Sequence, residues 1–362
     1  MAMINRYLWK ETTLSILIIT LGLLSMFSFF DLIEELDSLG EGTYNLSNIL
    51  TFVLLSIPGH IYDIAPVATL IGMMVSLGAL GRTSELTIMR VSGLSITNLG
   101  VMLVKVGLLF TITTILIGEF ITPVSEEAAQ RMRLEATEGV VAQNFESGLW
   151  VKDDKSFINV KTVLPDTTLL NLSIYEFDEN FKLLTISTAG KASYLDGRWR
   201  LNDVTQTKII ETDQVNDKHV ETTFFNKANW ESGVRPELLN ILLVEPEKMS
   251  AWNLYSFITH LANNKQKTNR YDVALWTKMI YPLACVVMVI LALPFSFLQQ
   301  RSSSTSAKIF IGILLGVTYQ IMNRVFIHIG VLNDWPPFMS AITPTALFLL
   351  AGIYLLFITE RR

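Results

Sequence analysis

The chain offers few residues whose types and spacing could perform covalent chemistry. Its four histidines lie too far apart in sequence for a metal site, and its single cysteine, Cys285, can form no internal disulfide. The nearest approach to a phosphate-binding loop, residues 189–193, lacks the upstream glycine and the Ser or Thr that should follow the lysine. We therefore expect no enzymatic active site, no metal and no cofactor on this chain.

A segment suited to binding a partner lies at residues 82–95. Ser84 could cap a short helix there, and Gly93 could end it. Such an amphipathic helix, parallel to a membrane surface, is typical of a docking element for a cytoplasmic motor. A plain interfacial helix with snorkelling arginines would have the same pattern, so both interpretations stay open. The candidate docking residues are Arg82, Ser84, Glu85, Leu86, Met89 and Arg90.

Charged residues also interrupt the apolar segments of the chain, where a charge is costly unless it is paired or hydrated. Lys105 and Arg324 are candidates for a functional role, with Asp63 and Glu119 as possible counter-ions. A purely structural role is the alternative for both. Lys278 is expected near a membrane interface, where its ammonium group can reach water.

The elements that must position these residues are membrane spans. Half of the 362 residues are hydrophobic and 17% are charged, against about 25% charged in a typical soluble domain. This composition excludes a disordered chain and argues against a soluble single domain. The net charge of −5 gives no indication of a nucleic-acid partner. Runs of about 20 apolar residues can cross a bilayer. The expected spans are residues 12–33, 50–81, 96–121, 273–298, 308–330 and 336–358.

Basic residues predict the orientation of these spans. The segment 31–48 and the turn 330–335 contain no Lys or Arg, whereas basic residues lie at the opposite ends of the spans. By the positive-inside rule, both termini are cytoplasmic and the long insert between the third and fourth spans is outside. The basic residues on the cytoplasmic side are Arg6, Lys10, Arg82, Arg90, Arg301, Lys308, Arg361 and Arg362.

The insert, residues 125–268, is polar and alternates in the manner of β-strands. Asp196-Gly197 marks a hairpin turn, and Ser250 could cap a helix of residues 251–263. About eight strands at regular spacing predict an antiparallel sandwich or jellyroll. The stretches with strand character include 156–161, 172–177, 199–204, 205–212 and 220–230.

The predicted fold class is an α-helical integral membrane protein. Six transmembrane helices, arranged three and three, would flank an inserted periplasmic all-β (jellyroll) domain. The expected domains are residues 1–124, with three spans and a cytoplasmic docking (coupling) helix at about 82–95, residues 125–268, with the jellyroll and a linker helix, and residues 269–362, with the last three spans.

Several short motifs, taken together and in order, resemble the LptF/LptG family of lipopolysaccharide-export ABC transporter permeases. The pattern Ser84-Glu85-Leu86…Met89…Ser92-Gly93 is similar to the coupling segment of that family. The other matching motifs are Arg6-Tyr7, Gly118-Glu119…Pro123, Gly148-Leu149-Trp150-Val151-Lys152 and Arg270-Tyr271…Trp276-Thr277-Lys278…Pro282. The last two look more like the G subunit than the F subunit.

The resemblance implies a role in an ATP-driven translocase of the bacterial inner membrane. Two related permeases, one LptF-like and one G-like, would pair on a cytoplasmic LptB-like ATPase dimer, which would hold ATP and magnesium. A single-span LptC-like protein would associate with the pair among the membrane lipids. The assembly would extract lipopolysaccharide and pass it along a bridge of periplasmic β-jellyrolls toward the outer membrane.

One feature departs from the family pattern. Known G subunits place lysines at the outer end of the first span, where this chain is acidic. Because an acidic rim repels phosphate, a divalent cation could bridge, the F subunit could supply basic groups, or the lipid could carry different head groups. A solvated loop that never touches the lipid is the alternative. The candidate cavity and rim residues are Phe27, Phe30, Asp31, Asp37 and Arg324, and the rim also contains Glu34, Glu35 and Glu41.

Small residues on the second and fifth spans would let helix backbones approach closely, either within the chain or against another subunit. These candidate packing residues are Ala68, Gly72, Ser76, Gly312 and Gly316. Two other functions also stay open: a permease of an ABC transporter that exports another lipid or a lipoprotein, and a non-transporting membrane-anchored scaffold with a periplasmic binding domain. Co-purification of an ATPase would separate export from the scaffold.

Overall fold

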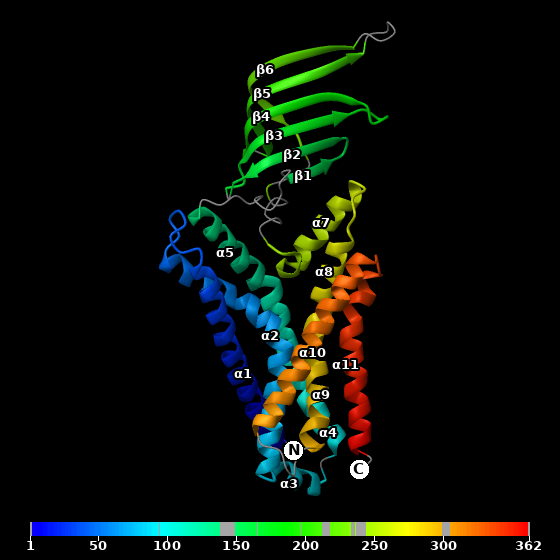
Figure 1. The fold of residues 1–362 in the computed structure, drawn as a ribbon. Coiled ribbons are helices and arrows are strands. Elements are labelled where there is room, and N and C mark those ends of the chain that lie inside the picture. The colour runs from blue at the N-terminus through cyan, green and yellow to red at the C-terminus, as the bar shows by residue number, and fades with distance from the viewer. Residues whose placement is uncertain are drawn as a thin grey trace.

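The helices and strands are taken from a computed structural model. It describes residues 2–93, 95–137, 149–164, 166–195, 197–211, 218–232, 236, 244–298 and 305–360. Within these ranges, six helical segments are long and apolar enough to cross a membrane: Met3–Leu36, Leu46–Arg82, Asn98–Ala136, Asn269–Phe295, Ile309–Leu332 and Pro337–Thr359. A six-stranded antiparallel sheet lies beyond one end of them (Figure 1). These elements confirm six spanning helices with an inserted β domain.

The first two helices are α1 (Ala2–Leu36) and α2 (Leu46–Arg82). Asn45 starts α2, because its side chain accepts hydrogen bonds from the backbone N–H groups of Ser47 and Asn48. α2 is the buried centre of the bundle and packs against α1, α5, α9 and α10. By contrast, α1 packs mainly on α2 and leaves most of its surface uncovered.

A short helix, α3 (Glu85–Val91), joins α2 to a long helical run. This run consists of α4 (Ile96–Leu116), the π-helical turn η1 (Ile117–Ile121) and α5 (Thr122–Ala136). Pro123 has no N–H to donate to the preceding turn, which is where the wider π-helical turn occurs. The run passes residue 125, where the sequence analysis started the β domain, because one face of α5 is buried against α2.

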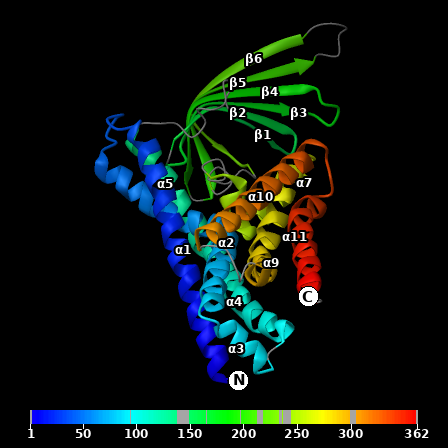
Figure 2. The ribbon, with the colours of Figure 1, turned by 60° about the horizontal axis from the view of Figure 1, so that its bottom comes forward.

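The sheet is a meander in which each strand pairs with the next. Its strands are β1 (Leu149–Asp153), β2 (Ser156–Val163), β3 (Leu169–Phe177), β4 (Leu183–Leu195), β5 (Arg198–Glu211) and β6 (Lys218–Trp230). Figure 2 shows them fanning out from one end. The hairpin predicted at Asp196-Gly197 is confirmed by the pairing of Leu195 with Arg198. Six strands are described where about eight were expected, partly because residues 199–204 and the stretch from Thr205 belong to one long β5.

The chain returns to the membrane through the 3-10 turn η2 (Pro246–Lys248) and α7 (Ala251–Asn263). The predicted cap of α7 is confirmed, since the Ser250 hydroxyl accepts from the Asn253 N–H at 3.1 Å. The remaining elements are α8 (Asn269–Ile280), the 3-10 turn η3 (Tyr281–Leu283), α9 (Ala284–Leu298), α10 (Thr305–Leu332) and α11 (Pro337–Glu360). α1 begins and α11 ends at the end of the helices away from the sheet (Figure 1).

Candidate functional site

The acidic rim at the end of α1 is partly neutralised from within the chain. The Asp31 carboxylate is hydrogen-bonded to the His60 ring of α2, and the ring of Phe27 stacks on His60 with centroids 5.6 Å apart. Phe30 is exposed on the same helix. Asp31 is therefore engaged with α2, and its partner lies 29 positions away in the sequence.

Glu35 is the second rim carboxylate with internal partners. It is almost fully buried, accepts a 2.8 Å hydrogen bond from the Tyr44 hydroxyl and lies 3.2 Å from Nε of Arg133 on α5. Burial, together with the bond to Glu35, raises the pKa of the Tyr44 hydroxyl. The α1–α2 connection is also tied to the end of α5, because the Thr43 N–H donates to the Ala136 carbonyl at 2.7 Å.

The other rim carboxylates, Glu34, Asp37 and Glu41, are exposed. The rim is thus less negative than its local sequence indicates. The partners of its carboxylates, His60 and Arg133, escaped the sequence analysis because they reach the rim from other helices, and no local pattern pointed to them.

A polar face surrounds Asp63, near the middle of α2. The Asp63 carbonyl accepts hydrogen bonds from the Tyr281 hydroxyl and from Nε2 of Gln320, the latter at 2.8 Å. Both donors come from segments far away in the sequence, Tyr281 from η3 and Gln320 from α10. Sequence analysis named neither donor.

Two cationic residues, Lys248 and Arg324, act electrostatically on the Asp63 carboxylate, as does His60 when it is protonated. Arg324 is exposed on α10, one helical turn beyond Gln320. The expected neighbourhood of Asp63 and Arg324 is therefore present, although the ion pairs found among the described residues do not include one between them. Lys105 is exposed on α4, and it too forms no ion pair with any of the residues that the structure describes.

The ammonium group of Lys278 does not reach water, contrary to the expectation. Lys278 is 7% exposed, and its ammonium group has no hydrogen-bond partner among the described residues. It lies 5.5 Å from the ring centroid of Tyr62, whose π face can attract a cation. The reason is that α8 is covered by α7, α10 and α11.

Glu119 and Glu126 contact the segment that returns from the sheet. Glu119 accepts from the Ala251 N–H at 2.9 and 3.1 Å, so it caps α7. Glu126 is buried, with an oxygen 3.3 Å from Nζ of Lys248. Burial alone would lower the pKa of Lys248, but the carboxylates of Glu126 and Asp63 outweigh it and raise the pKa.

The docking segment forms α3 as expected, and Gly93 follows it with a φ of +95°. Leu86 is fully buried and Met89 packs against the same core, so both hold α3 to the bundle. The exposed apolar side chains are Ile88 and Val91, which the sequence analysis did not select. Arg82 is exposed, Glu85 is half-buried and accepts from the Thr83 hydroxyl, and Ser84 has a φ of +61°. The side chain of Arg90 lies outside the described residues.

Comparisons with known proteins agree with this arrangement. The family model described as lipopolysaccharide export system permease LptF/LptG matches residues 6–357. The chain belongs to the LptF/LptG family. Lipopolysaccharide export system permease protein LptG of Haemophilus influenzae is 30% identical over 98% of both chains. The protein of the same name from Escherichia coli strain K12 is 28% identical over 98% of this chain and 97% of its own.

The predicted packing residues of this permease lie between its own helices. A Cβ atom on Gly312 of α10 would lie 3.1 Å from Ile71, and one on Gly316 would lie 2.5 Å from Val67. Ala68 and Ser76 are buried on α2, where Gly72 packs against α1. Of the two alternatives, the structure therefore shows packing within the chain.

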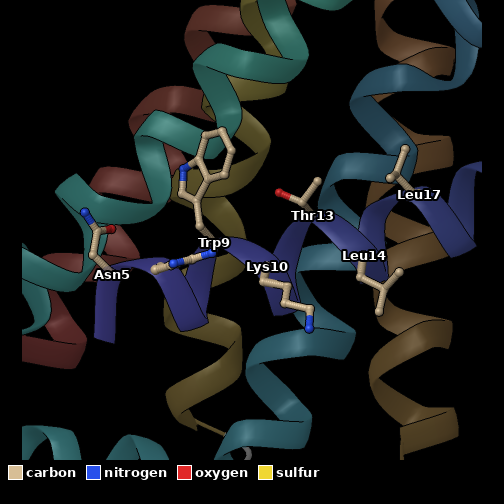
Figure 3. Close-up of a pocket in the computed structure, with 7 residues that line it drawn as sticks. Asn5, Trp9, Lys10, Thr13, Leu14 and Leu17 are labelled. Atoms are coloured by element: carbon tan, nitrogen blue, oxygen red, sulfur yellow. The ribbon is translucent and has the colours of Figure 1, made fainter. Parts of the chain in front are cut away.

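A hollow of about 720 Å³ lies along the first turns of α1 in this permease. Figure 3 shows Trp9 and Lys10 projecting to different sides of the helix. The lining residues are Asn5, Arg6, Trp9, Lys10, Thr13, Leu14 and Leu17. Since all of them belong to α1, the hollow is an uncovered face of that helix, and we assign no function to it.

Proposed function

We propose that this chain is the G-type membrane subunit of an ABC transporter that extracts lipopolysaccharide from the bacterial inner membrane. The lipid would then pass to a periplasmic β-jellyroll bridge toward the outer membrane. The family match across residues 6–357 carries this proposal, and the six spanning helices with an inserted sheet support it.

The proposed transporter contains three kinds of partner subunit, each with its own role. An LptB-like ATPase dimer would bind and hydrolyse ATP, an LptF-like permease would pair with the helices, and a single-span LptC-like protein would join the bridge. The bare outer surface of α1 is consistent with a neighbouring chain or lipid against it.

The proposed orientation places both termini and α3 in the cytoplasm and the sheet in the periplasm. Basic residues such as Arg6, Lys10 and Arg82 support it by the positive-inside rule. The start of α1, the end of α11 and α3 also share the end of the helices away from the sheet (Figure 1).

The proposed docking surface for the ATPase is the exposed side of α3. Ile88 and Val91 provide apolar area, while Arg82 and Glu85 provide charge. A core of apolar contacts with charges at its edge is a typical protein interface. Leu86 and Met89 set the position of this surface, because they pack α3 against the hydrophobic core.

The proposed lipid-facing residues lie near the end of α1 and on α10. Phe27 and Phe30 would face acyl chains, and Arg324 would face a phosphate. Because Arg133 pairs with Glu35, and the Asp31 carboxylate is hydrogen-bonded to His60, the repulsion of phosphate is smaller than the sequence indicates. A bridging divalent cation would then act only at Asp37 and the other exposed carboxylates.

Affinity purification of the tagged full-length chain from its native membrane tests this function. Recovery of an ATPase dimer, a second permease and lipopolysaccharide, identified by mass spectrometry, is the expected result. Recovery of an ATPase with a different lipid or a lipoprotein would replace the substrate. Recovery of neither an ATPase nor a lipid would replace the transporter with a scaffold.

A further inference from the structure

α7 is fixed at both of its ends, to different parts of the protein. At its start, both carboxylate oxygens of Glu119 accept from the Ala251 N–H, at 2.9 and 3.1 Å. At its other end, Oδ1 of Asn264 accepts from the Asp154 N–H at 2.8 Å. Asp154 lies in the turn between β1 and β2. One end of α7 is therefore held by the spanning helices and the other by the sheet.

Both contacts are of a kind that holds a helix end in place. A carboxylate at a helix N-terminus makes charge-assisted hydrogen bonds and interacts favourably with the helix dipole. Asn264 is buried, and its amide nitrogen donates to the His260 carbonyl at 3.0 Å, which orients its oxygen toward Asp154. Asp154 itself has a φ of +49°, so its N–H direction is set by a tight turn.

Between these contacts, α7 is a rigid element. Its 13 residues extend for about 20 Å at 1.5 Å per residue. Leu254 is buried with Met249 and Ala274, which places α7 against α8. The rings of Phe257 and Tyr271 meet edge to face at 4.6 Å. Figure 1 shows α7 between the spanning helices and the sheet.

The position of Glu119 depends in turn on α2. Glu119 lies in the π-helical turn η1, next to Gly118, where an added Cβ atom would lie 2.5 Å from the Tyr62 ring. A π-helical turn holds one extra residue, so its loss would rotate Glu119 away from α7. α2 leads directly to α3. Contacts therefore run from α3 through α2, η1 and α7 to the sheet.

We propose that α7 is a strut that couples the spanning helices to the β domain, with Glu119 and Asn264 as the positioning residues at its two ends. A rearrangement of α2 displaces η1, and α7 conveys that displacement to the turn between β1 and β2. The inference rests on the proposed transport function, because the displacement matters only if ATP-driven motion delivers lipid to the sheet.

Distance measurement in the complete transporter tests the strut. Spin labels at Asn180→Cys, in an exposed turn of the sheet, and Leu332→Cys, at the exposed end of α10, report the separation of the two parts. Both are introduced in a Cys285→Ser background. We expect a narrow distance distribution that shifts between the nucleotide-free and the ATP-trapped states, together with release of purified lipopolysaccharide on ATP addition.

Glu119→Ala should broaden the distribution, abolish the nucleotide-dependent shift and lower lipid release about fivefold, as expected for loss of one helix-capping contact. Glu119→Gln keeps an acceptor for the Ala251 N–H and should restore the shift. Asn264→Ala acts at the opposite end and should reproduce the effect of Glu119→Ala. The matched control is Glu135→Ala, an exposed carboxylate on α5, which should change neither readout.

The double variant Glu119→Ala/Asn264→Ala separates a strut from two independent contacts. A strut released at one end conveys nothing, so the double variant should be no worse than either single one. Multiplied losses, or a shift that survives both single variants, would overturn the strut. A wild-type transporter that shifts on ATP addition but releases no lipopolysaccharide would instead overturn the proposed function.

Discussion

Gly72 of α2 packs directly on the backbone of Ile16 in α1, since a Cβ atom at position 72 would lie 2.5 Å from Cα of Ile16. Both residues are in the apolar part of their helices, and Ile16 is fully buried. Because α1 packs mainly on α2, this contact and the hydrogen bond between Asp31 and His60 set the position of α1.

Gly72→Val should push α1 away from α2. Overpacking of this kind costs about 1–3 kcal/mol, so we expect a lower thermal unfolding temperature in detergent and weaker assembly with the paired permease. Gly22→Ala is the matched control on α1, because a Cβ atom there meets nothing within 4 Å. Equal stability of the two variants would show that α1 does not depend on this contact.

Arg133→Ala should destabilise the connection between α1 and α2 by leaving the buried Glu35 carboxylate without its cation. We expect a loss of about 1–3 kcal/mol, less than for a fully buried pair because Arg133 is partly exposed. Limited proteolysis in the segment 37–44 measures this loss.

Arg131→Ala, in the partly exposed pair with Glu127, is the control for this prediction, because here both partners reach solvent. Such surface pairs contribute about 0–1 kcal/mol, so cleavage should change little. If Arg131→Ala accelerated cleavage as much as Arg133→Ala, the role assigned to Glu35 would be wrong.

Ile88→Asp should weaken binding of the ATPase without unfolding the permease, because Ile88 is exposed on α3. Leu86→Ala should instead lower stability by about 2–5 kcal/mol, since Leu86 belongs to the core. Glu85→Lys should also lower ATPase recovery, because the new lysine would repel the basic residue of the ATPase that we expect opposite Glu85. Co-purification and thermal unfolding, measured on the same samples, separate the effects. Full ATPase recovery with Ile88→Asp and Glu85→Lys would favour a plain interfacial helix.

Cysteine labelling should reveal the orientation. In a Cys285→Ser background, Asn180→Cys in the sheet should react with an impermeant thiol reagent on intact spheroplasts, and Thr83→Cys should react only after lysis. Both positions are exposed, so burial does not explain a difference between them. The reverse pattern would overturn the proposed orientation.

Local sequence was sufficient for features that depend on nearby residues. The apolar runs predicted the spans, Asp196-Gly197 predicted a hairpin, and Ser250 predicted the start of α7. Each is determined by composition or by side chains within a few positions of the element.

Contacts between distant segments were not accessible in this way. Arg133 reaches Glu35 across 98 positions, and Glu119 meets Ala251 across 132. Lys278 was expected to reach water. Nothing in its neighbouring sequence indicated that its ammonium group lies beside the ring of Tyr62, which is far away in the sequence. In α3, Leu86 is buried and Ile88 is exposed because of the way α3 packs against the other helices. The local sequence does not determine which face of α3 is buried.

The most direct test of the transport function is ATP-driven release of lipopolysaccharide from the reconstituted transporter. Proteoliposomes would contain this chain, its paired permease, the ATPase dimer and the single-span bridge protein, with a soluble β-jellyroll protein as acceptor. Transfer of lipopolysaccharide to the acceptor should require ATP and should fall to background when this chain is omitted. Transfer that proceeds equally without this chain, or ATP-dependent transfer of a different lipid only, would contradict a lipopolysaccharide-export permease.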